Sequence, residues 1–249
     1  MRSPHVVTLA VSLGLVHVGA ARPALAGRTH YGWLPATEVS PERGVELETW
    51  ITELDNVGTA DRDKTELLWS PTLGLTDQLE LGLPIELSWV RVGGMPGATA
   101  LDRWGVEARY RFASSDPVDA PPWVPLVRVA VKREVDERRA VTLEADAVLS
   151  YECGRWHAAA GVSASQLFHS GPDVTVVRPL AGASYGVTDS LRLGLEVVST
   201  LVPRGVGPDW TAVGPNLGFT HGRFWVAASL PLGVSNVDTA PRVRWGIAF

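Results

Sequence analysis

Residues 73–83, LGLTDQLELGL, decide the fold, and nearly the same stretch returns at residues 185–195 as YGVTDSLRLGL. In each copy a Thr-Asp-Xaa turn is followed by leucines that alternate with other residues. Alternation with a period of two is typical of a β-strand, because successive side chains point to opposite faces of the sheet. A join as short as this connects antiparallel neighbours. Each copy is therefore predicted to be a tight β-hairpin.

The same alternation continues along most of the chain, and no segment shows a helical stripe of apolar residues. The segments are separated either by tight turns or by loops rich in Gly, Pro and Asp. No linker divides residues 45–249, which are predicted to form one all-β, antiparallel, up-and-down domain. We expect about twelve strands of about ten residues, at 45–54, 64–75, 79–92, 101–112, 124–134, 140–151, 156–168, 174–187, 191–201, 211–220, 224–233 and 240–249.

The N-terminus has the features of a secretory signal peptide, predicted to cover residues 1–26. Arg2 is followed by an apolar run over residues 6–18, and Ala24-Leu25-Ala26 forms a small-x-small cleavage site. An anchor helix is the alternative, but a membrane span needs about 20 apolar residues. Residues 27–44 then form an irregular leader that is long enough to enter a barrel lumen.

Charge and cysteine content exclude some kinds of protein. Without residues 1–26 the chain has 20 basic and 27 acidic residues, a net charge of −7, whereas nucleic-acid binding favours a basic surface. We therefore expect no nucleic-acid partner. Cys153 is the only cysteine, so the chain has no internal disulfide, and we expect a free thiol in a turn.

The alternating faces fit two architectures. A soluble barrel or sandwich buries its apolar face, whereas a transmembrane barrel turns that face toward lipid and encloses the polar one. Residues 79–89 show the contrast, with Leu79, Leu81, Leu83, Ile85, Leu87 and Trp89 on one face and Glu80, Gly82, Pro84, Glu86 and Ser88 on the other.

Three features favour the transmembrane barrel. The segments are about ten residues long, as tilted spanning strands require. The polar face contains glycines that would weaken a solvated strand: Gly82, Gly105, Gly161, Gly182, Gly194, Gly214, Gly218 and Gly246. Aromatic residues gather near the turns, as in an interfacial girdle: Trp50, Trp69, Trp89, Trp104, Tyr110, Phe112, Tyr151, Trp156, Phe168, Tyr185, Phe219, Phe224, Trp245 and Phe249.

The closing segment, RVRWGIAF, ends on Phe249 and resembles the last strand of Gram-negative outer-membrane β-barrel proteins. The two Thr-Asp hairpins are similar to those of transporter-like barrels of the MetA-pathway of phenol degradation type. This resemblance implies an outer-membrane location in contact with lipids, and both termini in the periplasm. It also implies that Trp245, Ile247 and Phe249 form the signal read by the barrel-assembly machinery. The join at residues 113–123 is longer than periplasmic turns usually are, which leaves the strand count open there.

The enclosed face is predicted to carry charges of both signs. One interpretation is a lumen held together by cross-strand ion pairs, and another is a charged ladder that selects permeating solutes; both can hold together. Glu46, Glu48 and Glu66 share this face with fifteen candidate lumen residues: Glu80, Glu86, Arg103, Glu107, Arg109, Arg111, Arg128, Lys132, Glu144, Asp146, Arg178, Arg192, Glu196, Arg242 and Arg244.

We expect a passive channel or transport-associated pore for small solutes. A non-conducting barrel with a structural, adhesive or sensory role is the alternative. A lipid hydrolase would need a serine beside His157, His169 or His221 on the outer face, and no His-x-Ser pair occurs on one strand face, so no enzyme is expected. The acids of residues 55–63 could bind calcium, but a solvated loop is the simpler interpretation; no metal or cofactor is expected.

Overall fold

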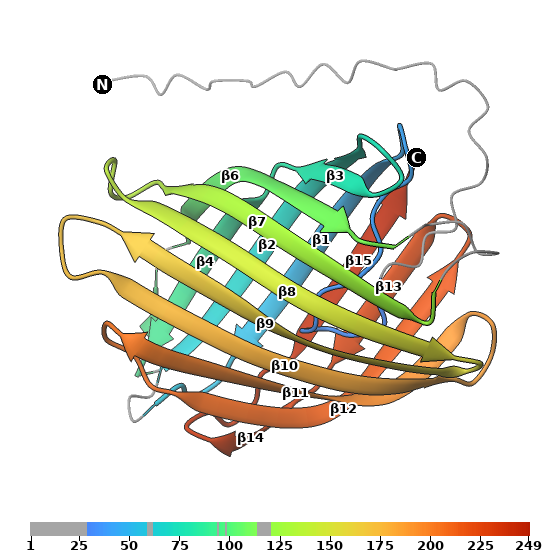
Figure 1. The fold of residues 1–249 in the computed structure, drawn as a ribbon. Coiled ribbons are helices and arrows are strands. Elements are labelled where there is room, and N and C mark those ends of the chain that lie inside the picture. The colour runs from blue at the N-terminus through green and yellow to red at the C-terminus, as the bar shows by residue number, and fades with distance from the viewer. Residues whose placement is uncertain (1–28, 59–61, 94, 98, 114–120) are drawn as a thin grey trace, which may run out of the picture.

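The computed structural model describes residues 29–58, 62–93, 95–97, 99–113 and 121–249. They form a single antiparallel sheet that closes into a barrel (Figure 1). The sheet closes where β1 (Val45–Leu54) pairs with β15 (Arg242–Ala248) on one side and with β2 (Arg62–Gly74) on the other. In this part of the chain, no helix is long and apolar enough to cross a membrane. The predicted signal peptide lies outside the described residues.

The barrel wall consists of twelve antiparallel segments that follow one another in chain order, and each segment is called a stave here. The predicted number of strands is therefore confirmed for the described residues. Two staves are interrupted, and each therefore consists of two strands. The short β5 (Met95–Pro96) only extends the loop after β4. The other strands are β3 (Leu79–Gly82), β4 (Ile85–Val92), β6 (Ala100–Arg111), β7 (Trp123–Glu134), β8 (Val141–Cys153), β9 (Trp156–Phe168), β10 (Val174–Gly186), β11 (Leu191–Arg204), β12 (Trp210–His221), β13 (Phe224–Ser229) and β14 (Leu232–Ser235).

Prolines cause both interruptions, because proline has no backbone N–H to donate to a neighbouring strand. Pro84 separates β3 from β4, and its carbonyl accepts a hydrogen bond from the N–H of Gly105 at 3.0 Å. Pro231 separates β13 from β14, and its carbonyl accepts from the N–H of Ala240 at 3.0 Å. The ladder therefore continues past each break, and the staves remain in place.

The long join at residues 113–123 does not alter the meander, because β6 and β7 pair directly with each other. Residues 114–120 of this join lie outside the described residues.

The two ends of the barrel differ. The turn end carries the tight turns after β2, β8, β10 and β12, and there Phe249 N–H donates to the carbonyl of Val45 at 2.9 Å. The long join between β6 and β7 is at this end as well, and the loop end carries the connections after β1, β4, β7, β9, β11 and β14.

The two Thr-Asp hairpins adopt one geometry. The hydroxyl of Thr76 accepts the N–H groups of Gln78 at 3.2 Å and Leu79 at 3.0 Å. The hydroxyl of Thr188 accepts those of Ser190 at 3.2 Å and Leu191 at 3.0 Å. The side chain thus satisfies backbone donors that the tight turn leaves without a ladder partner. The repeated sequence encodes the same turn twice.

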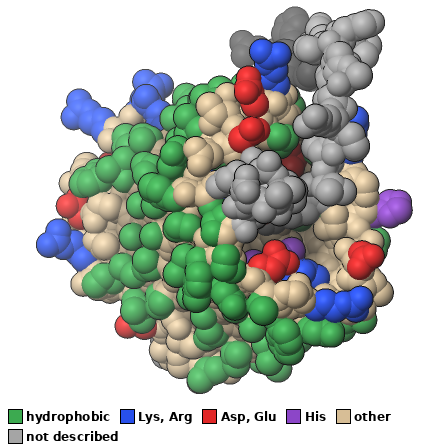
Figure 2. Space-filling model, turned by 45° about the vertical axis from the view of Figure 1, so that its right-hand side comes forward, with side chains coloured by type: hydrophobic (Ala, Val, Ile, Leu, Met, Phe, Trp, Pro, Cys, Tyr) green, Lys and Arg blue, Asp and Glu red, His purple; other side chains and the backbone are tan. Residues whose placement is uncertain are grey.

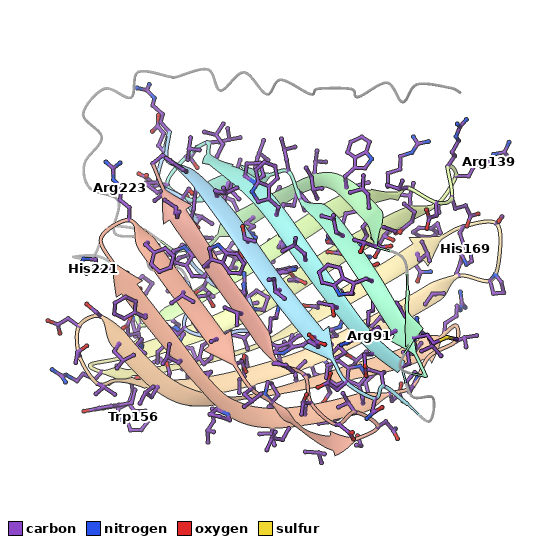
Figure 3. All side chains as sticks on the ribbon, turned by 180° about the vertical axis from the view of Figure 1, so that it is seen from behind. Arg91, Arg139, Trp156, His169, His221 and Arg223 are labelled. Carbon is purple, nitrogen blue, oxygen red and sulfur yellow. The ribbon has the colours of Figure 1, made fainter. Side chains whose placement is uncertain are left out.

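The apolar face lies on the outside of the barrel. Leu195 is 61% exposed, whereas Glu80 on the opposite face is 1% exposed. Figure 2 shows hydrophobic side chains covering much of the visible wall, with charged ones mainly at its margins. In Figure 3, Arg223 and His221 lie at one end of the barrel, and Arg139 and His169 lie at the other. This distribution is the inverse of a soluble protein's and suits a wall in contact with lipid.

Aromatic side chains form pairs around the outside of the turn end. Ring centroids are 4.5 Å apart for Trp123 and Tyr151 and 5.0 Å apart for Trp156 and Tyr185. Such a belt is typical of a membrane interface.

The prediction of an outward, interfacial position was wrong for Trp50, which faces the lumen. Its parity on β1 matches that of the inward residues Glu46 and Glu48, and alternation rather than nearness to a turn sets the face.

The single cysteine, Cys153, is the last residue of β8 and is an exposed free thiol.

The inverted orientation predicts how Val→Arg substitutions affect stability. Val129 is exposed in the middle of β7, so Val129→Arg places a charge in the lipid layer and is expected to cost about 2–4 kcal/mol. Val206 is 99% exposed in a loop, and Val206→Arg is expected to change stability by less than about 0.5 kcal/mol. Urea titration of the protein folded into phospholipid vesicles measures both. Equal losses would contradict a lipid-facing β7.

Candidate functional site

The lumen is the candidate functional site, and all fifteen predicted charged residues lie on its side of the wall. Ten of them line a cavity toward the loop end: Glu86, Arg103, Arg109, Arg128, Lys132, Glu144, Asp146, Arg178, Arg242 and Arg244. Arg111 and Arg192 line a second cavity toward the turn end. Glu80, Glu107 and Glu196 are almost fully buried and contact other lumen groups.

Neighbouring strands carry a continuous ion-pair network on one part of this wall. Lys132 is 1% exposed and contacts both Glu86 and Glu144, the latter at 2.7 Å. Arg103 also contacts Glu86, and Arg128 contacts Glu144 at 3.0 Å. These charges are removed from bulk water, so each needs partners nearby to offset its desolvation.

The network extends toward the turn end through Glu107. Arg109 and Arg128 stand directly opposite each other on β6 and β7, an unfavourable position for two like charges. Glu107 contacts both guanidinium groups at 2.8 Å and so separates the two cations electrostatically. Arg109 also contacts Glu48 at 3.0 Å, and Glu48 contacts Arg244 on the closing strand. The network therefore links β4 to β15.

The described part of the leader, residues 29–44, runs into the lumen. The sequence predicted a leader long enough for this position. Figure 1 shows this dark blue segment inside the barrel. Near Gly44 it is bonded to the turn after β2, where Arg43 N–H donates to the carbonyl of Gly74 at 2.9 Å. Further in, Ser40 N–H donates to Glu80 at 2.6 Å, and the hydroxyls of Thr37 and Ser150 lie 2.7 Å apart.

Glu196 on β11 holds the innermost part of the leader. Its carboxylate accepts the N–H groups of three consecutive residues: Gly32 at 3.0 Å, Trp33 at 3.1 Å and Leu34 at 3.3 Å. Successive backbone N–H groups that converge on one anion make a strong, charge-assisted contact. A charge on the barrel wall therefore fixes the leader backbone inside the lumen.

Aromatic residues of the leader fit against the wall. The indole N–H of Trp33 donates to the carbonyl of Ala240 at 2.8 Å, and its ring meets Trp210 edge-on at 5.7 Å. The Tyr31 hydroxyl donates to the carbonyl of His157 at 3.0 Å. A Cβ at Gly182 would lie 2.6 Å from the Tyr31 ring, so this inward glycine makes room for the leader.

The leader divides the lumen into two cavities. The loop-end cavity has a volume of about 180 Å³, and the turn-end cavity about 230 Å³. Pro35 and Ala36 line both of them, so these leader residues form the partition. The part of the lumen that the structure describes is therefore hollow on both sides of Pro35 and Ala36.

His157 and His169, two of the histidines considered for a hydrolase, lie in different settings. His157 lies inside against Tyr31, and Ser170 beside His169 donates to Glu137 at 2.6 Å rather than to the imidazole. Those hydrogen bonds from Ser170 lower the pKa of Glu137. Among the residues that the structure describes, no group of three His, Cys, Asp or Glu side chains could hold a metal ion.

A closed antiparallel sheet with an apolar exterior and a charged interior that contains cavities is a β-barrel of the outer-membrane type. This is the fold of the chain. Solved structures with the same fold support the assignment. The outer membrane channel from Pseudomonas putida F1 has a TM-score of 0.59 at 13% identity, over 86% of this chain and 98% of that one. The predicted resemblance to outer-membrane barrels is thus confirmed at the level of the fold.

Autotransporter barrels are similar as well. The β domain of the Bordetella autotransporter BrkA has a TM-score of 0.55 at 10% identity, over 83% of this chain and 99% of that one. The translocator domain of NalP from Neisseria meningitidis has a TM-score of 0.51 at 9% identity, over 83% and 87%. No family model and no curated protein matches the sequence. Identities this low show the shared fold alone.

Two lumen features were missed by the sequence analysis. Trp33 anchors the leader, yet residues 29–44 have no periodic pattern that could indicate their contacts. Trp225 is 1% exposed, and its indole N–H donates to Glu46 at 3.0 Å. Its parity on β13, one residue after the outward Phe224, was a usable signal. Gly246 lies beside this indole, where a Cβ would be 2.4 Å from the ring nitrogen.

The network predicts that one buried cation matters more than an exposed one. Lys132→Met leaves Glu86 and Glu144 with one fewer cation in a buried position and is expected to cost about 3 kcal/mol or more. Arg91→Met breaks an exposed pair with Glu53 and is expected to cost less than about 1 kcal/mol. Urea titration in vesicles compares the two variants. Equal costs would show that the network does not stabilise the barrel.

Proposed function

We propose that this protein is a passive outer-membrane channel for small polar solutes, with a lumen that its own leader narrows. The two cavities on either side of Pro35 and Ala36 carry the proposal. A barrel built only for rigidity has no need of space on both sides of a partition. The likeness in fold to the channel from Pseudomonas putida F1 supports the same conclusion.

Size and charge limit what could pass. A twelve-stave barrel lies between small barrels filled by side chains and wide porins, and the leader occupies part of its section. The walls beside the leader carry ion pairs, which favour hydrated polar solutes over apolar ones. In a narrow path the solute contacts the charged walls. Such a path is suited to selection among small solutes rather than to bulk diffusion.

The turn end is proposed to face the periplasm, as in the barrels that the closing segment resembles. Both ends of the barrel chain meet there, and the loop end then faces outward. Trp245 and Ile247 lie on the outer face of β15, and Phe249 directly follows that strand; Ile247 and Phe249 are exposed. This position makes them accessible to the barrel-assembly machinery, which we propose reads them.

A non-conducting structural barrel is the second candidate, and the firm attachment of the leader favours it. Glu196 binds three leader N–H groups, and Arg111 pairs with Glu38 at 3.1 Å. If these contacts never loosen and the space beside Pro35 admits no solute, the barrel is closed.

Single-channel recording in planar lipid bilayers separates the two candidates. The full chain is expected to show small conductance steps. Glu196→Gln removes the charge that holds the leader, and Gly182→Val removes the space for Tyr31, so both variants are expected to show steps at least about twice as large. Gly186→Ala, whose Cβ would meet only ordinary contacts at 3.6 Å or more, is the matched control and is expected to match the parent.

The absence of steps in the parent and in both leader variants would overturn the channel and establish a closed barrel. Steps of unchanged size in Glu196→Gln and Gly182→Val would retain the channel but refute the leader as its narrowest part. Folding of each variant is checked by heat-modifiable migration on gels, since an unfolded barrel also gives no steps.

A further inference from the structure

We propose that the loop-end cavity binds a small carboxylate with an apolar body, and that Arg178 and Arg242 hold its charge. This inference deepens the proposed function, because it names a class of solute for the lumen. Binding at the site does not depend on the channel; only the passage of the solute through the barrel rests on the proposed function. The motivating contrast lies among the cavity's own cations. Arg103, Arg128 and Lys132 each contact acids, whereas Arg178 and Arg242 do not.

No carboxylate of the described residues comes within 4.0 Å of either guanidinium group. Glu66 lines the same cavity, but the ammonium group of Lys64 contacts it at 2.6 Å. Glu86, Glu144 and Asp146 are engaged by the network of β6 and β7. Two cations therefore share a confined space without a dedicated acid, and a bound anion would relieve their desolvation and mutual repulsion.

The guanidinium group of Arg242 lies against two indole rings. Its central carbon lies 3.8 Å from the ring centre of Trp50 and 4.7 Å from that of Trp33. Stacking on indoles engages the faces of a guanidinium group and leaves its N–H groups, which point outward from the edge, for other partners. Nε of Arg242 is buried and has no hydrogen-bond partner in the described structure. An orphaned donor of this kind is costly, and because Nε itself is closed off from the cavity, a ligand would accept from the terminal N–H groups beyond it.

Arg178 lines the same cavity as Arg242. Its Nε donates to the hydroxyl of Thr200 at 3.3 Å, and Thr200 is opposite Trp210 in the β11–β12 ladder. The ring of Trp210 meets that of Trp33 edge-on, and the guanidinium group of Arg242 lies over Trp33. Both cations therefore share this cavity with Trp33 and Trp210.

The ligand chemistry follows from this arrangement. The fork of a guanidinium group matches the two oxygens of a carboxylate. The body of the ligand would contact Trp210, Leu180 and other apolar side chains that line the cavity. A volume of about 180 Å³ admits only a small molecule. A short, branched monocarboxylate fits these conditions, because it combines one carboxylate group with a compact apolar body.

Calorimetric titration of the folded, detergent-solubilised full chain tests the site without requiring conductance. Isovalerate is the probe, isovaleramide is its neutral counterpart of the same shape, and acetate lacks the apolar body. Isovalerate is expected to bind. Isovaleramide lacks the negative charge and acetate lacks the apolar body, so each is expected to bind at least about tenfold more weakly.

Arg178→Met and Arg242→Met are expected to raise the Kd for isovalerate about tenfold or more, whereas Arg223→Met, at the turn-end rim, is expected to leave it unchanged. Among the residues that the structure describes, Arg178 hydrogen-bonds only to Thr200, so Arg178→Met is the variant that should fold normally if Arg242→Met does not. Equal binding of isovaleramide, no binding of isovalerate, or an unchanged Kd in Arg178→Met would each overturn the site. Binding without conductance would retain the site and refute the channel.

Discussion

The pairing of β1 with β15 is the constraint on which the rest of the structure depends. In lipid no water can satisfy a free backbone N–H or C=O, so a spanning sheet must have no open edge. Residues 46–52 of β1 pair one by one with the closing strand, and the ring is complete. Closure gives every stave one lipid face and one enclosed face. The strict alternation of leucines with glycines and charges follows from that geometry.

Closure also explains the ionic lumen. Once the apolar residues face lipid, the inside can hold polar groups, and in so small a space a charge without a partner is costly. Glu107 between Arg109 and Arg128, and Lys132 between Glu86 and Glu144, are local solutions to this requirement. The leader is a larger one, because its backbone N–H groups satisfy Glu196, which contacts no cation among the described residues of the wall.

The sequence carries much of the fold, since a period of two is a local signal. It predicted the staves and the inverted faces, and the paired residues Glu86–Arg103 and Arg128–Asp146 are direct neighbours in the ladder. Trp50 was misplaced because nearness to a turn was given more weight than alternation.

Contacts across the lumen could not be predicted in this way. Glu196 meets residues more than 160 positions earlier in the chain, and the leader that it holds has no periodicity. Likewise, no strand register specifies that the ammonium group of Lys64 contacts Glu66.

A cysteine pair at positions 37 and 150 tests most directly whether the leader lies inside a closed membrane barrel. The hydroxyls of Thr37 and Ser150 are 2.7 Å apart, and Cys153 is changed to Ser because its exposed thiol would compete. Thr37→Cys/Ser150→Cys in folded protein is predicted to form a disulfide under mild oxidation, detectable by mass spectrometry after proteolysis, with neither thiol open to a water-soluble maleimide. Two free thiols that both react with the maleimide would contradict the account.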